Sequence, residues 1–179
     1  MIYPCISGID YESIADGPGI RATMFLSGCN HNCPGCHNPQ THNPEYGTRI
    51  NESIINNIAQ HIRSRFYISG ITLSGGDPLY NISETTNFIY SLRNRLGDQW
   101  SQYTLWLYTG YTWEQLMKIY GENEDLQKLL LITDVVVDGP YIEKLADASL
   151  AFRGSSNQRI IDVNQSLKTN EVVLWNHST

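Results

Sequence analysis

Three cysteines lie within eight positions of the chain, in the segment SGCNHNCPGCHN. Cys29, Cys33 and Cys36 are separated by three residues and then by two, whereas the fourth cysteine, Cys5, stands apart. Thiolates at this spacing can wrap around one metal ion or one metal cluster, and the Gly and Pro residues between them allow the tight backbone that this requires. In a reducing compartment, cysteines grouped in this way indicate metal binding before a disulfide.

The cysteine spacing by itself leaves three interpretations open. A 4Fe–4S cluster held by three cysteines has one iron with an open coordination position, to which a small molecule can bind directly. Structural zinc takes four ligands, so a zinc ion would have to recruit His31 or His37. In the third interpretation the cysteines bind no metal at all.

A second motif, SGGDP, follows the short predicted strand GITLSGG. Gly75 and Gly76 expose backbone at the end of that strand, where a ligand can approach closely, and Asp77 offers a carboxylate to a cationic amino group. A glycine turn followed by a helix cap would have the same sequence. Because the cysteine loop also follows a strand, we interpret SGGDP as part of a ligand-binding site.

Other strand ends and loops carry candidate residues with an alternative for each. In YTGY, Thr109 ends a third predicted strand, and in VVVDGPY, Asp138 ends a fourth; both either line a pocket or only cap a strand. The segment DGPGIR, residues 16–21, forms either a loop over the metal site, with Arg21 available to a carboxylate or to a partner protein, or an ordinary Gly–Pro turn. RGSSNQ, residues 153–158, is polar and is typical of an exposed surface loop.

The elements that must position these motifs alternate between strand and helix. The periodicity predicts four strands, at 20–27, 70–76, 103–111 and 131–141, and two closing strands at 159–163 and 172–175. It predicts helices over 51–65 and 83–96, one after Thr112, and a short one around 141–146. Asn51 and Ser83 are the expected N-caps of the first two helices, and the spacing from Thr112 to Gln115 predicts a capping box.

Repeated strand-then-helix units imply right-handed crossovers and an α/β fold with a mostly parallel sheet. In such a sheet the strands end at one edge, so the four motif-bearing loops should converge there. A closed barrel of eight units takes about 250 residues. With 179 residues, the chain can form only a partial, open one.

Length and composition predict one globular domain over residues 1–179, with a C-terminal tail that is expected to be flexible. The net charge of −6 argues against a general nucleic-acid binder, because neutralising phosphates requires a basic surface. No apolar run approaches the roughly 20 residues of a membrane span. The first ten residues lack the features of a secretion signal, so we expect a cytoplasmic protein.

The cysteine pattern Cys29-x3-Cys33-x2-Cys36 resembles the signature of the radical S-adenosylmethionine (SAM) superfamily, and SGGDP resembles its glycine-rich SAM-binding motif. The resemblance implies a partial barrel of the radical SAM type, with a 4Fe–4S cluster whose unique iron is chelated by SAM. Reductive cleavage of SAM would then give a 5′-deoxyadenosyl radical. It also implies SAM contacts at Gly75, Gly76, Asp77 and Thr109, and adenine contacts at Gly35, Cys36 and His37.

Further motifs resemble a subgroup of that superfamily. DGPGIR, CPGCHNPQT, TLSGGDPL, YTGY, VVVDGPY and FRGSSNQRIIDV occur in an order similar to that of the activating proteins of anaerobic ribonucleoside-triphosphate reductases, from about residue 8 to 165. The resemblance implies an oxidoreductase that generates a glycyl radical on the large subunit of the reductase, with electrons from a flavodoxin-like donor. It implies no catalytic side chain beyond the cluster ligands.

Two sequence details and two other functions accompany this interpretation. Gly35 replaces an aromatic residue found in many superfamily members, and His37 stands where reductase activators often have Tyr. One alternative function is a radical SAM enzyme with a small-molecule substrate, similar to 7-carboxy-7-deazaguanine synthase. The other is a zinc-binding domain without catalysis.

Overall fold

The computed structural model describes residues 1–176, and within this range seven strands form one open sheet in the order β3-β1-β2-β4-β5-β6-β7. The strands are β1 Cys5–Ser13, β2 Ile20–Leu26, β3 Thr48–Arg49, β4 Ile68–Gly75, β5 Thr104–Tyr108, β6 Val135–Asp138 and β7 Arg159–Asp162. The helices are α1 Glu52–Arg63, α2 Ile82–Leu96, α3 Trp113–Tyr120, α4 Glu124–Leu131 and α5 Val163–Thr169, with 3₁₀ turns at Pro39–His42, Gly97–Gln102 and Glu143–Leu145.

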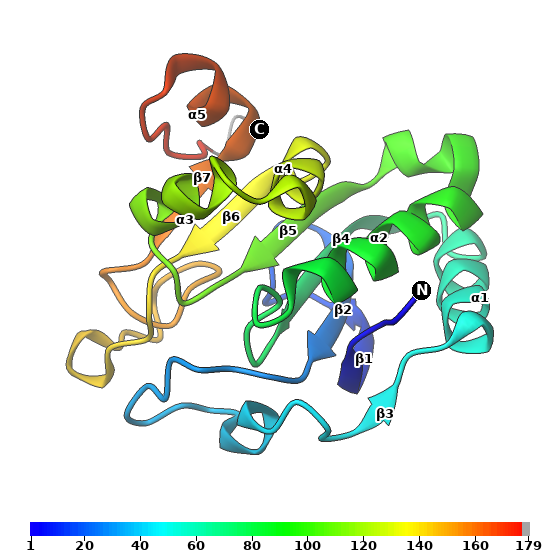
Figure 1. The fold of residues 1–179 in the computed structure, drawn as a ribbon, viewed down its shortest axis with the longest axis horizontal. Coiled ribbons are helices and arrows are strands. Elements are labelled where there is room, and N and C mark those ends of the chain that lie inside the picture. The colour runs from blue at the N-terminus through cyan, green and yellow to red at the C-terminus, as the bar shows by residue number, and fades with distance from the viewer. Residues whose placement is uncertain (177–179) are drawn as a thin grey trace.

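The four central strands, β2, β4, β5 and β6, are parallel, and the chain moves from each to the next in one direction across the sheet. Right-handed crossovers between such strands place their helices on the same face. Figure 1 shows α1, α2, α3 and α4 on that one face. The outer strands β1, β3 and β7 pair antiparallel with their neighbours. The prediction of a mostly parallel, open α/β sheet is therefore confirmed for the centre of the sheet.

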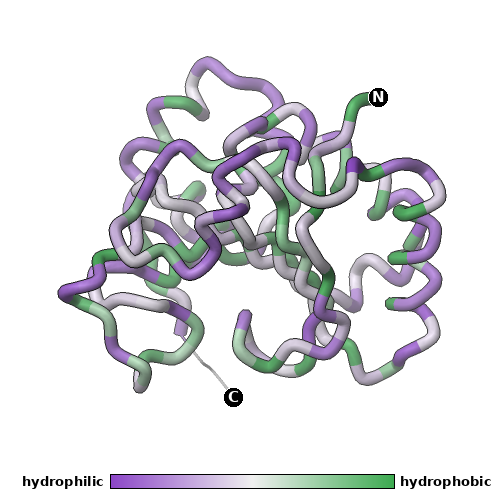
Figure 2. Tube along the Cα trace, turned by 90° about the horizontal axis from the view of Figure 1, so that it is seen from below, coloured by the Kyte–Doolittle hydropathy of each residue, from purple (hydrophilic) through white to green (hydrophobic). Residues whose placement is uncertain are grey.

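The main hydrophobic core lies between these helices and the sheet. On α1, Ile55, Ile58 and Ile62 are fully buried at helical spacing, and Asn51 accepts a hydrogen bond from the N–H of Ile54 as the predicted N-cap. Burying one such side chain contributes about 1.5–3 kcal/mol. In Figure 2 hydrophobic and hydrophilic positions alternate along the helices, which fits helices with one buried face.

Several predicted element boundaries differ from the structure. Strand β1 was not predicted at all, and the segment 172–175 forms an isolated bridge between Leu174 and Ile161 and no strand. The N-cap of α2 lies two residues earlier than predicted, because Asn81, and not Ser83, accepts a hydrogen bond from the N–H of Glu84. The capping box at the start of α3 is present, and the short helix expected around 141–146 is a 3₁₀ turn.

The DGPG segment lies at the start of β2, at the opposite end of that strand from the cysteines, so it does not cover the metal site. It packs on the sheet face that carries no α-helix. Thr72 donates a hydrogen bond to the carbonyl of Asp16, and a Cβ at Gly17 would lie 2.8 Å from Arg21 Cδ and 3.1 Å from the Trp106 ring.

Arg21 is fully buried, so the expectation that it would be available to a partner protein is wrong. Its guanidinium donates to Thr72 Oγ1 at 2.7 Å, to the Ile71 carbonyl at 2.8 Å and to the Thr104 carbonyl at 2.9 Å, and it lies over the Trp106 ring. Burial lowers the pKa of Arg21 to about 10, so the side chain remains charged at neutral pH. The Arg21 side chain therefore stabilises the sheet on the face that carries no α-helix.

The described part of the C-terminal tail consists of α5 and a segment that returns to β7. The N–H of Asp162 donates to the Val173 carbonyl, and the N–H of Trp175 donates to the Ile160 carbonyl. Residues 177–179, the end of the tail expected to be flexible, lie outside the described residues. Within residues 1–176, every helix is too short or too polar to cross a lipid bilayer.

Candidate functional site

Four loops that follow the parallel strands enclose one cavity of about 210 Å³, as predicted from the order of strands and motifs. Figure 1 shows the loop after β2 and the loop after β6 extending from the same edge of the sheet. The cavity is lined by Cys29, His31, Cys33, Cys36, His37, Asn38 and His42 after β2, Ser74, Gly75 and Gly76 at the end of β4, Tyr108, Thr109 and Gly110 at the end of β5, and Gly139, Tyr141, Gly154 and Gln158 after β6. Cys5 is buried elsewhere, beside Arg49.

The cysteine loop, residues 29–37, brings its three thiols to this cavity without helix or strand. A turn joins two of them, because the N–H of Cys36 donates to the Cys33 carbonyl at 3.1 Å. Gly35 has φ of +72°, and a Cβ there would lie 2.9 Å from the carboxyl carbon of Glu143. Both the positive φ and the close approach explain why glycine occupies this position.

Cys29 is partly buried at the edge of the cavity, and its surroundings change the pKa of its thiol. Burial raises the pKa of the Cys29 thiol, and the backbone N–H groups of His31 and Asn32 act in the opposite direction because they donate to the sulfur. Cys29, Cys33 and Cys36 all line the one cavity, and iron–sulfur clusters are held by cysteine thiolates. The residues present therefore fit a cluster bound through thiolates.

Gly75 and Gly76 hold the end of β4 close to the backbone that leads into the cysteine loop. The N–H of Gly76 donates to the Leu26 carbonyl at 2.8 Å, and the N–H of Asp77 donates to the Gly28 carbonyl at 2.7 Å. A Cβ on Gly75 would lie 2.4 Å from the Leu26 oxygen, and one on Gly76 would lie 2.5 Å from the Gly28 oxygen. Both glycines are thus required by backbone atoms of β2 or of the segment that follows it, and both also line the cavity.

Asp77 is 2% exposed and joins three loops through its carboxylate. Oδ2 accepts hydrogen bonds from His31 Nε2 at 2.6 Å, Thr109 Oγ1 at 2.9 Å and the Gly110 N–H at 3.0 Å, and Oδ1 accepts one from the Leu79 N–H at 2.8 Å. Its hydrogen bond to Asp77 raises the pKa of His31, against the effect of burial. The Asp77 carboxylate, which we expected to bind a cationic ligand, is therefore hydrogen-bonded to groups of the protein itself.

The loop from Gly139 to Gln158, here called the 139–158 loop, forms the remaining wall of the cavity. Its Glu143 carboxyl group packs on Gly35, and its Tyr141 ring lies 5.4 Å from the His37 ring. These contacts hold the cysteine loop, which contains no helix or strand, against the 139–158 loop and close the cavity on this side.

The RGSSNQ segment builds this loop and is not simply an exposed polar stretch. Ser155 is fully buried, and Gln158 lines the cavity. Gln158 Oε1 accepts hydrogen bonds from the N–H groups of Gly154 and Ser155, and its Nε2 donates to the Gly139 carbonyl. Asn157 Nδ2 donates to the Pro140 carbonyl. The polar side chains hold the backbone of their own loop.

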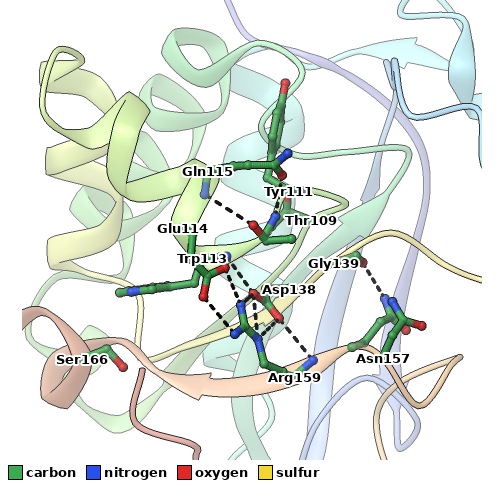
Figure 3. A network of polar contacts seen from close by, with 12 residues as sticks. Thr109, Tyr111, Trp113, Glu114, Gln115, Asp138, Gly139, Asn157, Arg159 and Ser166 are labelled. Carbon is green, nitrogen blue, oxygen red and sulfur yellow. Dashed lines mark hydrogen bonds and ion pairs between the residues drawn. The ribbon is translucent and has the colours of Figure 1, made fainter. Parts of the chain in front are cut away.

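Asp138 does not line the cavity. It precedes the 139–158 loop, Arg159 follows that loop, and contacts between these two residues and the start of α3 hold both ends of the loop in place. Figure 3 shows Arg159 between Asp138 and Glu114. Its guanidinium donates to Asp138 Oδ2 at 2.5 Å and to both Glu114 oxygens at 2.9 and 3.0 Å. The N–H of Trp113, at the start of α3, donates to Asp138 Oδ2 at 2.7 Å. Asp138 is therefore a structural residue, as in the strand-capping alternative.

Of the residues predicted for the site, Gly35, Cys36, His37, Gly75, Gly76 and Thr109 line the cavity together with Cys29 and Cys33, whereas Asp77 reaches it through its partners. In residues 1–176 no three His, Cys, Asp or Glu side chains are grouped closely enough to bind a single metal ion. Sequence reasoning missed the contact of His31 with Asp77 and the contributions of Tyr141 and Gln158. The position of His31 between two cysteines was the available signal.

Known proteins resemble the chain over most of its length. Residues 15–161 match the model of the 4Fe-4S single cluster domain family, which supports an iron–sulfur cofactor. The anaerobic ribonucleoside-triphosphate reductase-activating protein of Enterobacteria phage T4 is 35% identical over 161 residues, which are 89% of this chain and 90% of that protein. Proteins of the same name from Vibrio cholerae and Escherichia coli K12 are each 36% identical, covering 82% and 81% of this chain and 90% of each relative. The chain belongs to the family of anaerobic ribonucleoside-triphosphate reductase-activating proteins.

Proposed function

We propose that this protein is a radical SAM activase that generates a glycyl radical on the large subunit of an anaerobic ribonucleoside-triphosphate reductase. The observation that carries the proposal is the gathering of three cysteines, two glycines of SGGDP and Thr109 on the walls of one cavity, at the carboxyl edge of a parallel sheet. That edge is where parallel α/β folds bind their ligands. In this proposal the open sheet is a partial barrel of the radical SAM type.

In the proposed function, Cys29, Cys33 and Cys36 hold a 4Fe–4S cluster, and backbone at Gly75 and Gly76 lets SAM approach closely. When bound, the cluster and SAM together supply a 5′-deoxyadenosyl radical that removes a hydrogen atom from a glycine. The protein binds and orients these groups and keeps water away from them. No side chain has to move a proton.

The residues around the cysteine loop have corresponding roles in this proposal. The backbone from Gly35 to His37 contacts the adenine, and the 139–158 loop, through Tyr141 and Glu143, covers this part of the cavity. A flavodoxin-like protein supplies the electron, and the reaction takes place in the cytoplasm, where thiols remain reduced. In this proposal a glycine-bearing loop of the reductase enters the cavity at the carboxyl edge of the sheet, where the strand-end loops lie.

The metal site is tested by anaerobic reconstitution with iron and sulfide, followed by measurement of iron and sulfide per chain. We expect Cys29→Ala, Cys33→Ala and Cys36→Ala each to lose the cluster. Cys5→Ala is the matched control, because Cys5 is 3% exposed and lies outside the cavity, and it should retain the cluster. Zinc in place of iron, or full iron content in the three variants, would contradict the assignment.

The reaction is tested by adding reductant, SAM and the candidate reductase to the reconstituted protein. We expect 5′-deoxyadenosine to accumulate and a glycyl doublet to appear in the electron paramagnetic resonance spectrum of the reductase. The three cysteine variants should give neither product. Cleavage of SAM without any glycyl radical on the cognate reductase would instead favour an enzyme with a small-molecule substrate.

A further inference from the structure

The carboxylate of Asp77 already accepts a full set of hydrogen bonds from the protein. An ionised carboxylate has about four lone-pair sites. Both oxygens contact Thr109 Oγ1, and in addition Oδ1 accepts from the Leu79 N–H, while Oδ2 accepts from the Gly110 N–H and His31 Nε2. A cationic ligand could therefore join Asp77 only by displacing one of these donors.

His31 is the donor that extends from the cysteine loop, and its ring is held on several sides. Because an ionised carboxylate only accepts hydrogen bonds, Nε2 carries the proton in the 2.6 Å contact with Asp77. The ring packs so closely on Gly110 that a Cβ there would lie 2.5 Å from His31 Cδ2. Its other neighbour is the Tyr111 ring, at 4.7 Å and nearly perpendicular. These contacts leave the imidazole one position.

The backbone of His31 links this fixed ring to the cluster ligands. The residue stands midway between Cys29 and Cys33 in the chain, so the position of its backbone is tied to that of both cysteines. The cysteine loop contains no helix or strand, so its conformation depends on contacts with other segments. The hydrogen bond from His31 to Asp77 joins the cysteine loop to a residue 46 positions away in the sequence.

We propose that His31 is a positioning residue that fastens the cysteine loop to the ends of β4 and β5 through Asp77. Asp77 then acts through His31, Thr109 and Gly110 and does not itself bind the amino group of SAM. The identity of the ligands, a cluster and SAM, rests on the proposed function, whereas the hydrogen bond between His31 and Asp77 does not. In the opposing model, the amino group of SAM displaces His31 from Asp77.

The first experiment measures hydrogen–deuterium exchange by mass spectrometry in the full-length, metal-free protein at constant pH. Loss of a hydrogen bond to a charged group should make exchange in the peptide 28–38 about tenfold faster in His31→Ala. His31→Gln retains an N–H donor and should stay within about threefold of the wild type. His61→Ala, on α1 and outside the cavity, is the matched control and should leave this peptide unchanged.

Exchange in α2 distinguishes a local effect from general unfolding. Unchanged exchange of residues 82–96 in His31→Ala, together with faster exchange of 28–38, supports the proposal. Equal acceleration in both segments, or no acceleration in 28–38, overturns it. Because this comparison uses protein without metal, its result does not depend on whether the proposed function is correct.

The second experiment measures SAM binding to the reconstituted protein by calorimetry. The proposal predicts that His31→Ala binds SAM about tenfold more weakly and that His31→Gln restores most of the affinity, since a disordered loop must be ordered on binding. Tighter binding of SAM by His31→Ala would overturn the proposal in favour of displacement. A wild-type protein that assembles no cluster or binds no SAM would refute the proposed function, and the exchange experiment would still test the hydrogen bond.

Discussion

Two buried aspartates follow parallel strands of the same sheet, and they have different partners. Asp77, after β4, is 2% exposed and accepts from a histidine, a threonine hydroxyl and loop N–H groups. Asp138, at the end of β6, is 1% exposed and accepts from the fork of Arg159 and from the first N–H of α3. The partners of Asp77 lie in loops, whereas those of Asp138 begin a strand and a helix.

The comparison shows that the element carrying the partner decides what a buried carboxylate stabilises. Arg159 is always charged, and its planar group binds Asp138 and Glu114 together, so this contact joins β6, β7 and α3. The contact of Asp77 with His31 joins a loop without regular structure to two strand ends. We therefore expect changes at Asp138 to affect the whole fold and changes at Asp77 to affect mainly the site.

The largest expected effect on stability comes from Arg159→Ala. Removal of the guanidinium leaves the Asp138 carboxylate buried without its charged partner, and breaking such a pair lowers the free energy of unfolding by about 3 kcal/mol. Urea denaturation followed by circular dichroism measures the loss. Arg159→Lys is the control: it keeps the charge but not the planar fork of donors, so its free energy of unfolding should lie between those of the wild type and Arg159→Ala. A loss below about 1 kcal/mol would remove the basis of the comparison.

The second expected effect, from Asp77→Asn, is smaller and local. The amide places an N–H₂ group opposite donors such as His31 Nε2 or the Gly110 N–H, so at least one of these hydrogen bonds is lost. Loss of a hydrogen bond costs about 1–3 kcal/mol when a buried group is left unsatisfied. Hydrogen exchange should accelerate mainly in residues 28–38 and 109–112. Equal acceleration throughout β6 and β7 would show that Asp77, like Asp138, stabilises the whole fold.

The sequence allowed prediction of the features that depend on local pattern. The three consecutive valines of β6 and the isoleucine spacing of α1 predicted buried elements, and the positions of the loops after parallel strands predicted one cavity. The gathering of Cys29, Cys33 and Cys36 there follows from the same rule. These predictions required only periodicity and the direction of the strands.

Other features depend on interruptions of the pattern or on contacts between distant residues. Strand β1 has irregular register between Ile6 and Gly8 and again between Asp10 and Ser13, which hides the alternation of a strand. The N-cap of α2 could not be chosen because Asn81 and Ser83 are both good capping residues. Arg21 was misinterpreted because its partners come from β4 and β5, which no local pattern identifies.

A third prediction concerns Thr109, whose hydroxyl contacts both oxygens of Asp77 and accepts from the Tyr111 N–H. Thr109→Val keeps the shape of the side chain but removes the donor, which should lower the free energy of unfolding by about 1 kcal/mol. Thr109→Ser retains the hydroxyl and should be closer to wild type. Urea denaturation of the two variants tests this order, and a Thr109→Ser protein less stable than Thr109→Val would contradict it.

The smallest effect, at Glu114, tests the Asp138 region by pH. Hydrogen bonds from Arg159 lower the pKa of Glu114 to about 2, below its ordinary value of 4.5. A depressed carboxyl pKa stabilises the folded state above the unfolded pKa, and this stabilisation is lost as the pH falls from about 4.5 toward 2. Glu114 is largely exposed, so solvent weakens the contribution.

Thermal unfolding of wild type and Glu114→Gln over a range of pH measures this contribution directly. The glutamine removes the charge that titrates, so the wild type should unfold at the higher temperature near pH 7, and the difference between the two proteins should shrink below pH 4.5. Asp138 remains paired with Arg159 in both proteins, so the comparison measures only the exposed ion pair between Arg159 and Glu114. A difference that persists unchanged at pH 2 would mean that Glu114 stabilises α3 through its packing and not through its charge.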